Sequence, residues 1–329
     1  MESWNAVMLL MQLITTIVMI LGLCAEFSGG SNELAYHYYD SSCPFVEDIV
    51  RKEMISIFEA DPSAPAAFLR LLFHDCQVQG CDASILLNSK YSEMQCSKNF
   101  GIRKLEEIGR LKLILEVACP RQVSCADIIA LAARDSVLFS GGPFIQIPLG
   151  RKDSTSCSSL QADAYLPSTT INVDQLLHIF NAKGMDLQES VAILGGHTLG
   201  AGHCTNIVDR LYKTNLTDQM DPKFQLALKI GCPSKTLINN LTFIPNDMTP
   251  TIFDNQYYRD IVMGKGLFDI DSNIARDSRT MTIVNQFAID EEYFFQAFSS
   301  AFVKLSSANV LTGNRGEVRL QCDQVNHLH

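Results

Sequence analysis

The cysteines constrain the fold of this chain more than any other feature of its sequence. Ten of the eleven lie beyond the apolar N-terminal segment and are spread from Cys43 to Cys322. An even number of widely spaced cysteines favours disulfides over a metal cluster, provided that the chain folds in an oxidising compartment. Such bridges would join segments that are far apart in the sequence, although spacing alone does not assign the pairs.

The N-terminus indicates that compartment. No charged side chain occurs from Ser3 to Ala25, and residues 7–23 are mostly Leu, Ile, Val and Met. We therefore expect a signal peptide over residues 1–25, with cleavage between residues 25 and 33, and secretion to the extracellular space or cell wall. The segment has no Lys or Arg, and its length also fits an uncleaved membrane anchor. Acceptor sequences for N-glycosylation at Asn215 and Asn240 agree with secretion.

Composition excludes two broad classes of protein. Apolar residues make up 47% of the 329 residues and charged residues only 19%, which is too much core material and too little charge for a disordered chain. The net charge of −10 leaves no basic surface for nucleic acid. One large domain or two modest ones fit the length.

Helical spacing of apolar residues dominates the rest of the chain. We expect helices in residues 61–76, where two prolines confine the helix to the C-terminal part, and in residues 124–139, 186–195 and 294–305. Strand character is confined to short pieces such as 145–149. The sequence therefore predicts a mainly α fold.

Arg70, Phe73 and His74 occupy one face of the first of these helices, because they stand at positions i, i+3 and i+4. A guanidinium beside an imidazole disfavours protonation of the imidazole, which stays available as a base at neutral pH. Taken alone, the same pattern also fits a surface arginine and a structural histidine in the core.

Two stretches are rich in oxygen donors. Residues 75–84 carry two carboxylates, a hydroxyl and a glycine turn between two cysteines, and residues 246–255 have the same character. Such donors suit a hard cation such as calcium better than zinc. An acidic disulfide loop without a metal is the alternative for the first stretch.

A second histidine stands in the sequence Gly195-Gly196-His197-Thr198, where a predicted helix ends. Glycines leave room for a large flat group to approach the backbone. A helix C-terminus with no further role is the alternative interpretation.

The chain resembles the secretory (class III) plant haem peroxidases from about Leu34 to Asn326, so the resemblance implies a haem-peroxidase domain over residues 34–326. The matching motifs are Tyr38-Tyr39-Asp40-Ser41-Ser42-Cys43-Pro44, Arg70-Leu71-Leu72-Phe73-His74-Asp75-Cys76, Val123-Ser124-Cys125-Ala126-Asp127, Gly150-Arg151-Lys152-Asp153-Ser154, Gly195-Gly196-His197-Thr198, Thr249-Pro250, Phe253-Asp254-Asn255, Val310-Leu311-Thr312-Gly313 and Gly316-Glu317.

The resemblance implies a fold in which helices from two halves enclose one haem b, with minimal β structure. His197 would be the axial ligand of the iron, and Asp271 would accept the other ring N–H of this histidine. His74 would move the proton of hydrogen peroxide, Arg70 would stabilise the developing negative charge, and Asn99 would orient His74.

The same resemblance implies two calcium ions and four disulfides. The first ion would be bound by Asp75, Val78, Gly80, Asp82, Ser84 and, through water, Glu93. The second would be bound by Thr198, Thr249, Ile252, Asp254 and the residue at position 246. The implied bridges are Cys43–Cys119, Cys76–Cys81, Cys125–Cys322 and Cys204–Cys232.

Several positions depart from the family pattern. Cys96 and Cys157 are additional, and we expect them to form a fifth bridge. Residues expected to contact the haem carboxylates or line the cleft differ, namely Ser63, Ala67, Leu72 and Pro245. In the second calcium site Asn246 stands where an Asp is expected, which weakens calcium binding unless Asp247 rotates into the site.

The expected activity is the reduction of hydrogen peroxide through a ferryl intermediate, followed by one-electron oxidation of small phenolic donors at the haem edge near Pro167. We expect a monomer without nucleic-acid partners and, after signal cleavage, without a stable membrane partner. A haem-poor wall protein on the same fold and a non-haem calcium-binding protein are the alternatives. Lignin precursors, auxin and other phenols all remain open as donors.

Overall fold

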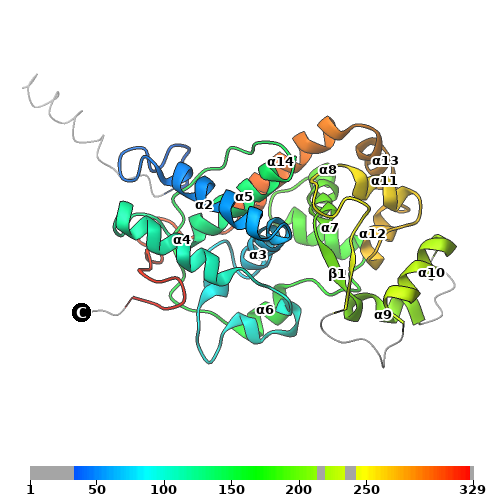
Figure 1. The fold of residues 1–329 in the computed structure, drawn as a ribbon, viewed down its shortest axis with the longest axis horizontal. Coiled ribbons are helices and arrows are strands. Elements are labelled where there is room, and N and C mark those ends of the chain that lie inside the picture. Colours follow the sequence, from blue (N-terminus) through cyan, green and yellow to red (C-terminus); the bar gives the residue numbers. More distant parts are fainter. Residues whose placement is uncertain (1–32, 213–218, 234–241, 327–329) are drawn as a thin grey trace, which may run out of the picture. The chain divides into compact units, whose positions relative to one another are not determined.

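Helices make up most of the computed structural model, which describes residues 33–212, 219–233 and 242–326 (Figure 1). The α-helices in these residues are α2 (Val46–Ala60), α3 (Ala64–Gln77), α4 (Leu105–Ala118), α5 (Cys125–Phe139), α6 (Ser159–Tyr165), α7 (Val173–Asn181), α8 (Leu187–Ala192), α9 (Cys204–Tyr212), α10 (Pro222–Gly231), α11 (Gln256–Val262), α12 (Asp269–Ile274), α13 (Met281–Ile289) and α14 (Glu291–Ser307). Four short 3₁₀ segments accompany them: η2 (Ser84–Leu86), η3 (Glu93–Gln95), η4 (Ser97–Asn99) and η5 (Ile193–Thr198). The prediction of a mainly α protein is confirmed.

Local capping explains where the predicted helices begin. The Ser124 hydroxyl accepts the backbone N–H of Asp127 at the start of α5, and Asp186 with Glu189 forms a capping box before α8. Pro65 lies in the first turn of α3, where its missing N–H costs nothing. All four helices expected from the sequence are present at these places.

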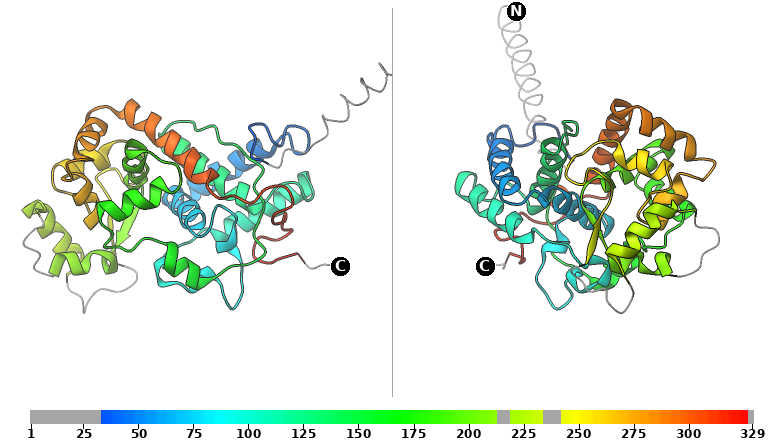
Figure 2. Two further views of the ribbon diagram at one scale, coloured as in Figure 1. Left: turned by 180° about the vertical axis from the view of Figure 1, so that it is seen from behind. Right: turned by 45° about the vertical axis from the view of Figure 1, so that its right-hand side comes forward.

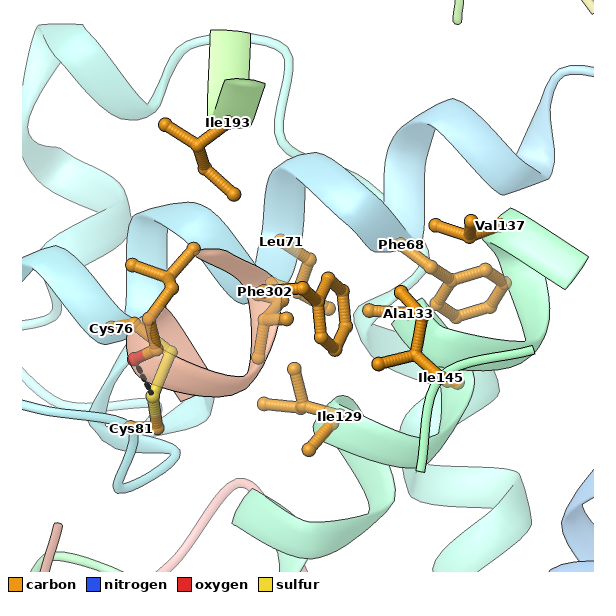
Figure 3. Close-up of a cluster of buried hydrophobic side chains, with 14 of the residues drawn as sticks. Phe68, Leu71, Cys76, Cys81, Ile129, Ala133, Val137, Ile145, Ile193 and Phe302 are labelled. Atoms are coloured by element: carbon orange, nitrogen blue, oxygen red, sulfur yellow. Dashed lines mark hydrogen bonds between the residues drawn. A yellow bond between two sulfur atoms is a disulfide. The ribbon is translucent and has the colours of Figure 1, made fainter. Parts of the chain in front are cut away.

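Helix α5 is the centre of the main hydrophobic core. Every residue from Cys125 to Val137 is buried, which is typical of a helix surrounded by protein on all sides. Figure 3 shows Phe68 and Leu71 of α3 and Phe302 of α14 packed with side chains of α5. Two further views show α14, in orange, crossing near this centre (Figure 2). The core therefore holds α3, the helix of Arg70 and His74, in a set position.

The β structure differs from the prediction. Residues 145–149 alternate between buried and exposed side chains, yet their backbone forms no strand beyond one isolated bridge between Ala35 and Leu149. Extended backbone alone produces this alternation, whereas a strand also needs a neighbouring strand to pair with. The strands of the described residues are instead β1 (Ala201–His203) and β2 (Phe243–Pro245), which pair antiparallel.

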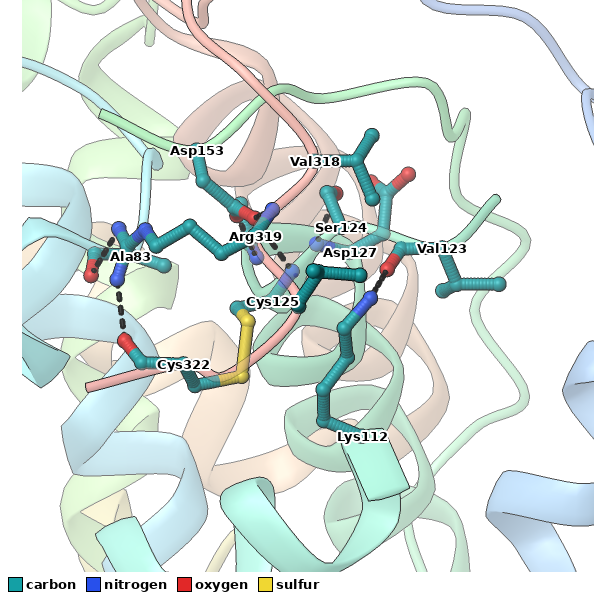
Figure 4. The surroundings of a disulfide bond; sticks show 12 residues. Ala83, Lys112, Val123, Ser124, Cys125, Asp127, Asp153, Val318, Arg319 and Cys322 are labelled. Carbon is teal, nitrogen blue, oxygen red and sulfur yellow. Dashed lines mark hydrogen bonds between the residues drawn. A yellow bond between two sulfur atoms is a disulfide. The ribbon is translucent and has the colours of Figure 1, made fainter. Parts of the chain in front are cut away.

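The described residues contain four disulfides, and all four pairings implied by the resemblance are confirmed. They are Cys43–Cys119, Cys76–Cys81, Cys125–Cys322 and Cys204–Cys232. Around the third bridge, Arg319 donates its backbone N–H to Asp153 at 3.0 Å and a guanidinium N–H to the carbonyl of Ala83 at 2.8 Å (Figure 4). The C-terminal segment is thereby tied to both α5 and the loop after α3.

The predicted fifth bridge is wrong for this structure, because Cys96 and Cys157 are free thiols. The buried Cys96 packs in a small apolar cluster with Val78, Ala162 and Leu166. Cys157 contacts the hydroxyl of Ser89 at 3.2 Å instead. The two thiols thus have different neighbours.

Three sequence predictions fall outside the described residues, namely the signal peptide over residues 1–25 and the glycosylation sites at Asn215 and Asn240. The described residues from Leu34 to Asn326 belong to one compact unit. Within the part of the chain that can be described, no helix combines the length and apolar character needed to cross a bilayer.

A substitution at Gly195 tests how tightly the core holds the segment of His197. A methyl group added there would overlap the ring of Phe294 and lie 2.8 Å from the hydroxyl oxygen of Tyr258. We expect Gly195→Ala to lower the free energy of unfolding by about 1–3 kcal/mol, as overpacking of dense cores does. Urea denaturation measures this change.

Gly109→Ala is the matched control. Gly109 lies inside α4, and a methyl group there meets no atom within 4 Å. This change should raise the free energy of unfolding by about 0.5–1 kcal/mol, because alanine is the better helix former. Equal effects of the two substitutions would contradict the packing argument.

Candidate functional site

Arg70 and His74 lie together on α3, as their spacing predicts. The guanidinium Nε of Arg70 is 3.2 Å from Nε2 of His74, and Nη2 donates to the carbonyl of Phe100 at 2.9 Å. Burial and, second, the charge of Arg70 lower the pKa of His74 to about 3. Burial also lowers the pKa of Arg70 to about 10. The pair is a cation beside a neutral imidazole at physiological pH, not an exposed arginine beside a structural histidine.

Asn99 determines which nitrogen of His74 carries the proton. Nδ2 of Asn99 donates to the carbonyl of Glu93 at 2.9 Å, so Oδ1 of this amide is turned toward His74. Nδ1 of His74 lies 2.6 Å from that oxygen and is the donor in this contact. Nε2 of His74 is therefore the acceptor nitrogen, and in this structure it accepts from Nε of Arg70 at 3.2 Å.

His197 is placed against the same face of α3 by glycines. It lies in η5. A methyl group added at Gly196 in this segment would be 3.3 Å from Leu69, and one added at Gly200, just beyond it, would be 2.7 Å from Ala66. This close approach brings η5 onto the part of α3 that also carries Arg70. The side chain of His197 keeps 35% of its area exposed, so the ring is open on one side.

Asp271, at the start of α12, holds the other side of the His197 ring. Nδ1 of His197 donates to Oδ1 of Asp271 at 3.0 Å, and the backbone N–H of Phe268 donates to Oδ2 at 2.8 Å. The hydroxyl of Tyr257 also donates to Oδ1, at 2.9 Å. Nε2 of His197 is thus the nitrogen left to bind a metal.

Tyr257 is a donor throughout the physiological pH range. Burial, together with the negative charge of Asp271, raises the pKa of this phenol well above its usual value. The ring also stands edge-on to the imidazole of His197, with the centroids 5.8 Å apart at 88°. The aromatic neighbours of His197 are Tyr257 and Phe268, while Pro245 belongs to β2.

The loop after α3 gathers the first oxygen-rich set. Asp75, Asp82, Ser84 and Glu93 are all buried, as are Val78 and Gly80 between them. Oδ1 of Asp75, Oγ of Ser84 and Oε2 of Glu93 are buried atoms without a hydrogen-bond partner.

Burial in this loop makes the charged forms unfavourable. It raises the pKa of Asp82 to about 6 and that of Glu93 to about 7, and the pKa of Asp75 also rises. Buried oxygens that lack partners, on carboxylates that repel one another, fit a hard divalent cation. The loop supplies the donor chemistry that calcium prefers.

The second oxygen-rich set contains a residue that differs from the expected one. The Thr198 hydroxyl lies 3.1 Å from Asp254 and 2.7 Å from Asp247, and the Thr249 hydroxyl lies 3.1 Å from Asp254. Asn246 instead turns its amide N–H₂ to the carbonyl of Leu199 at 3.0 Å. Two carboxylates, those of Asp247 and Asp254, therefore face the Thr198 hydroxyl.

Pro167 follows α6 and is tied to the distal segment. Lys98, directly before Asn99, donates to the carbonyl of Leu166 at 2.9 Å.

Ser63, one of the positions that departs from the family pattern, has an arginine as a neighbour. Arg103 donates to the hydroxyl of Ser63 at 2.8 Å. The guanidinium of Arg103 thus reaches Ser63, the position at which the family pattern has an arginine and this chain does not. The same guanidinium also contacts Asp61 at 2.8 Å.

Sequence reasoning missed the role of Tyr257 and left that of Asp247 undecided. Tyr257 occupies a run of apolar and aromatic residues that looks like ordinary core, and nothing in its spacing separates it from Tyr258. Asp247 was visible as a carboxylate shifted by one position, but which side chain turns inward depends on the loop conformation.

Comparisons with known proteins agree with this arrangement. A family model described as Peroxidase matches residues 50–290. Peroxidase 29 of Arabidopsis thaliana is 51% identical over 317 residues, which cover 92% of this chain and 94% of that protein. Peroxidase 46 and Peroxidase 21 of the same plant are 38% and 39% identical, over 95% and 94% of this chain and 97% and 96% of their own lengths. The chain is therefore a peroxidase of the haem-peroxidase fold, and it belongs to the class III plant peroxidase family.

Proposed function

We propose that this protein is a secreted, calcium-stabilised haem peroxidase that reduces hydrogen peroxide and oxidises small phenolic donors one electron at a time. The mature domain would span residues 34–326 after removal of residues 1–25. The observation that carries the proposal is the pair of histidines with opposite partners: His74 beside the cation of Arg70, and His197 on the carboxylate of Asp271.

The residues present fit a haem. His197 has Nδ1 committed to Asp271, which leaves Nε2 for the iron, and its side chain is 35% exposed. The glycines around His197 let α3 and α14 pack closely against its backbone, which fixes the position of the imidazole. When bound, the haem would be oxidised by two electrons by hydrogen peroxide and would be reduced to its resting state in two one-electron steps.

The chain's own groups would move the proton. Nε2 of His74 would take a proton from the oxygen of hydrogen peroxide that binds and deliver it to the oxygen that leaves. Arg70 would stabilise the negative charge that develops on the oxygens of the peroxide during this proton transfer. Asn99 keeps the proton of His74 on Nδ1 through its contact at 2.6 Å, so Nε2 would take the proton of the peroxide once Arg70, which donates to Nε2 in this structure, turns to the peroxide.

Calcium would stabilise the distal side in particular. The carbonyl of Glu93 holds Asn99, and the carboxylate of Glu93 belongs to the first calcium set. An ion bound there would therefore support the orientation of His74 through Glu93 and Asn99. Phenolic donors would give up electrons at the haem edge near Pro167, whose segment is bound to Lys98.

Replacing His74 tests the proton-transfer role. We expect His74→Gln to lower the rate constant for reaction with hydrogen peroxide by about 10²–10⁴-fold, the usual range for loss of general acid–base catalysis. Stopped-flow absorbance of the haem-loaded protein measures this rate. His178→Gln, at an exposed histidine of α7, is the control and should react like the unchanged protein. An undiminished rate in His74→Gln would contradict the assignment.

The pH dependence follows from the lowered pKa of His74. The folded protein binds this proton only near pH 3, whereas the unfolded chain binds it near pH 6.5. The contribution of His74 to the free energy of unfolding is therefore lost as pH falls from 6.5 toward 3. We expect the rate with peroxide to be flat from pH 8 to about pH 4 and then to fall, measured soon after a pH jump. A rate that halves near pH 6.5 would show that His74 is not shielded.

Removal of calcium should destabilise the protein most at neutral and alkaline pH. The pKa values of about 6 for Asp82 and about 7 for Glu93 mean that protons replace the cation as pH falls. At pH 8, calcium at a hundred times its dissociation constant should add about 2.7 kcal/mol per site. Calorimetric melting with calcium or a chelator, at pH 8 and pH 5, checks this.

Asp82→Asn should reduce the calcium effect, whereas Asp48→Asn, at an exposed carboxylate of α2, should leave it unchanged. A melting temperature that is independent of calcium at pH 8 would exclude the proposed ion.

A further inference from the structure

Asp271 accepts two side-chain donors on one oxygen. Nδ1 of His197 at 3.0 Å and the hydroxyl of Tyr257 at 2.9 Å both point to Oδ1, while Oδ2 is bound by the backbone N–H of Phe268. The carboxylate is 1% exposed, so water does not compete for it. The hydrogen bond that His197 makes is therefore shared with a fixed second donor.

Tyr257 is held in this geometry by its surroundings. It is 2% exposed in α11, and its ring packs edge-on against Tyr258 with centroids 4.9 Å apart. A buried phenol needs a hydrogen-bond partner, and Oδ1 of Asp271 is the acceptor it contacts. The contact is thus part of the packed core and not a chance surface arrangement.

We propose that Tyr257 is a positioning residue that weakens the His197–Asp271 hydrogen bond and thereby raises the reduction potential of the iron. This inference rests on the proposed function, because it requires that His197 bind haem iron. Each donor on Oδ1 withdraws negative charge from it. With Tyr257 present, Oδ1 accepts less strongly from Nδ1 of His197, and the imidazole donates less charge to the metal.

Removal of the phenolic hydroxyl should have the opposite effect. In Tyr257→Phe, Oδ1 keeps only the N–H of His197, so the imidazole becomes more basic and favours ferric iron. We expect the ferric form to gain up to about tenfold over the ferrous form, which lowers the potential by up to about 59 mV for one electron. The iron–histidine stretching frequency of the ferrous protein, seen by resonance Raman, should rise.

Tyr258→Phe is the matched control. Tyr258 is the next residue on α11, is equally buried, and donates to the carbonyls of Val191 and Ala192 at 2.9 and 3.1 Å. Its loss removes a buried hydrogen bond of the same kind without touching Asp271. The control should lose stability yet keep the potential and the stretching frequency.

A strengthened donor tests the sign independently. Site-specific 3-fluorotyrosine at position 257 has a more acidic hydroxyl, so it should raise the potential and lower the stretching frequency. A purely structural role of Tyr257 would leave both unchanged, because the ring and its packing are nearly the same.

The outcomes separate the two proposals. Opposite shifts in Tyr257→Phe and the fluorotyrosine protein, with none in Tyr258→Phe, support the inference. Haem binding with unchanged potential and Raman frequency in all variants overturns it while the proposed function stands. A wild-type protein that shows no Soret band after haemin and calcium are supplied overturns the proposed function and this inference together.

Discussion

Each histidine of the site has one ring nitrogen bound to a buried oxygen acceptor, and much of the structure serves to hold these two acceptors. On the distal side the acceptor is Asn99, whose amide is oriented by the carbonyl of Glu93. On the proximal side it is Asp271, held by Phe268 and Tyr257. Because a neutral imidazole has one donor and one acceptor nitrogen, binding one of them decides what the other can do.

The buried carboxylates differ in whether the protein itself supplies partners for their charge. Asp127 is paired with Arg151 at 2.8 Å, and Asp153 accepts the first N–H groups of α5 as well as that of Arg319. The carboxylates of Asp75, Asp82 and Glu93 are also buried, but they repel one another and leave oxygens without partners. Burying unpaired charge costs several kcal/mol, so this loop is the place where a cation has most to contribute.

The sequence predicted what depends on local pattern and on recognisable motifs. The α3 and α5 helices follow from prolines, caps and apolar spacing, and the distal and proximal histidines follow from motifs that the structure brings together across α3 and η5. The pairing of β1 with β2 and the separation of Cys96 from Cys157 are set by tertiary packing, which short-range pattern does not contain. The second donor on Asp271 belongs to the same class, since Tyr257 and Tyr258 differ only in where the helix points them.

The two imidazoles show how one residue type performs opposite tasks. His74 faces the guanidinium of Arg70 in a dry environment, so its charged form is disfavoured and it can accept a proton only transiently. His197 faces a carboxylate, which draws its N–H proton away and increases the electron density that its other nitrogen can give to a metal. A base that must release its proton and a ligand that must stay bound therefore need neighbours of opposite charge. Exchanging those neighbours would make the distal imidazole a poor acid and the proximal one a weak ligand.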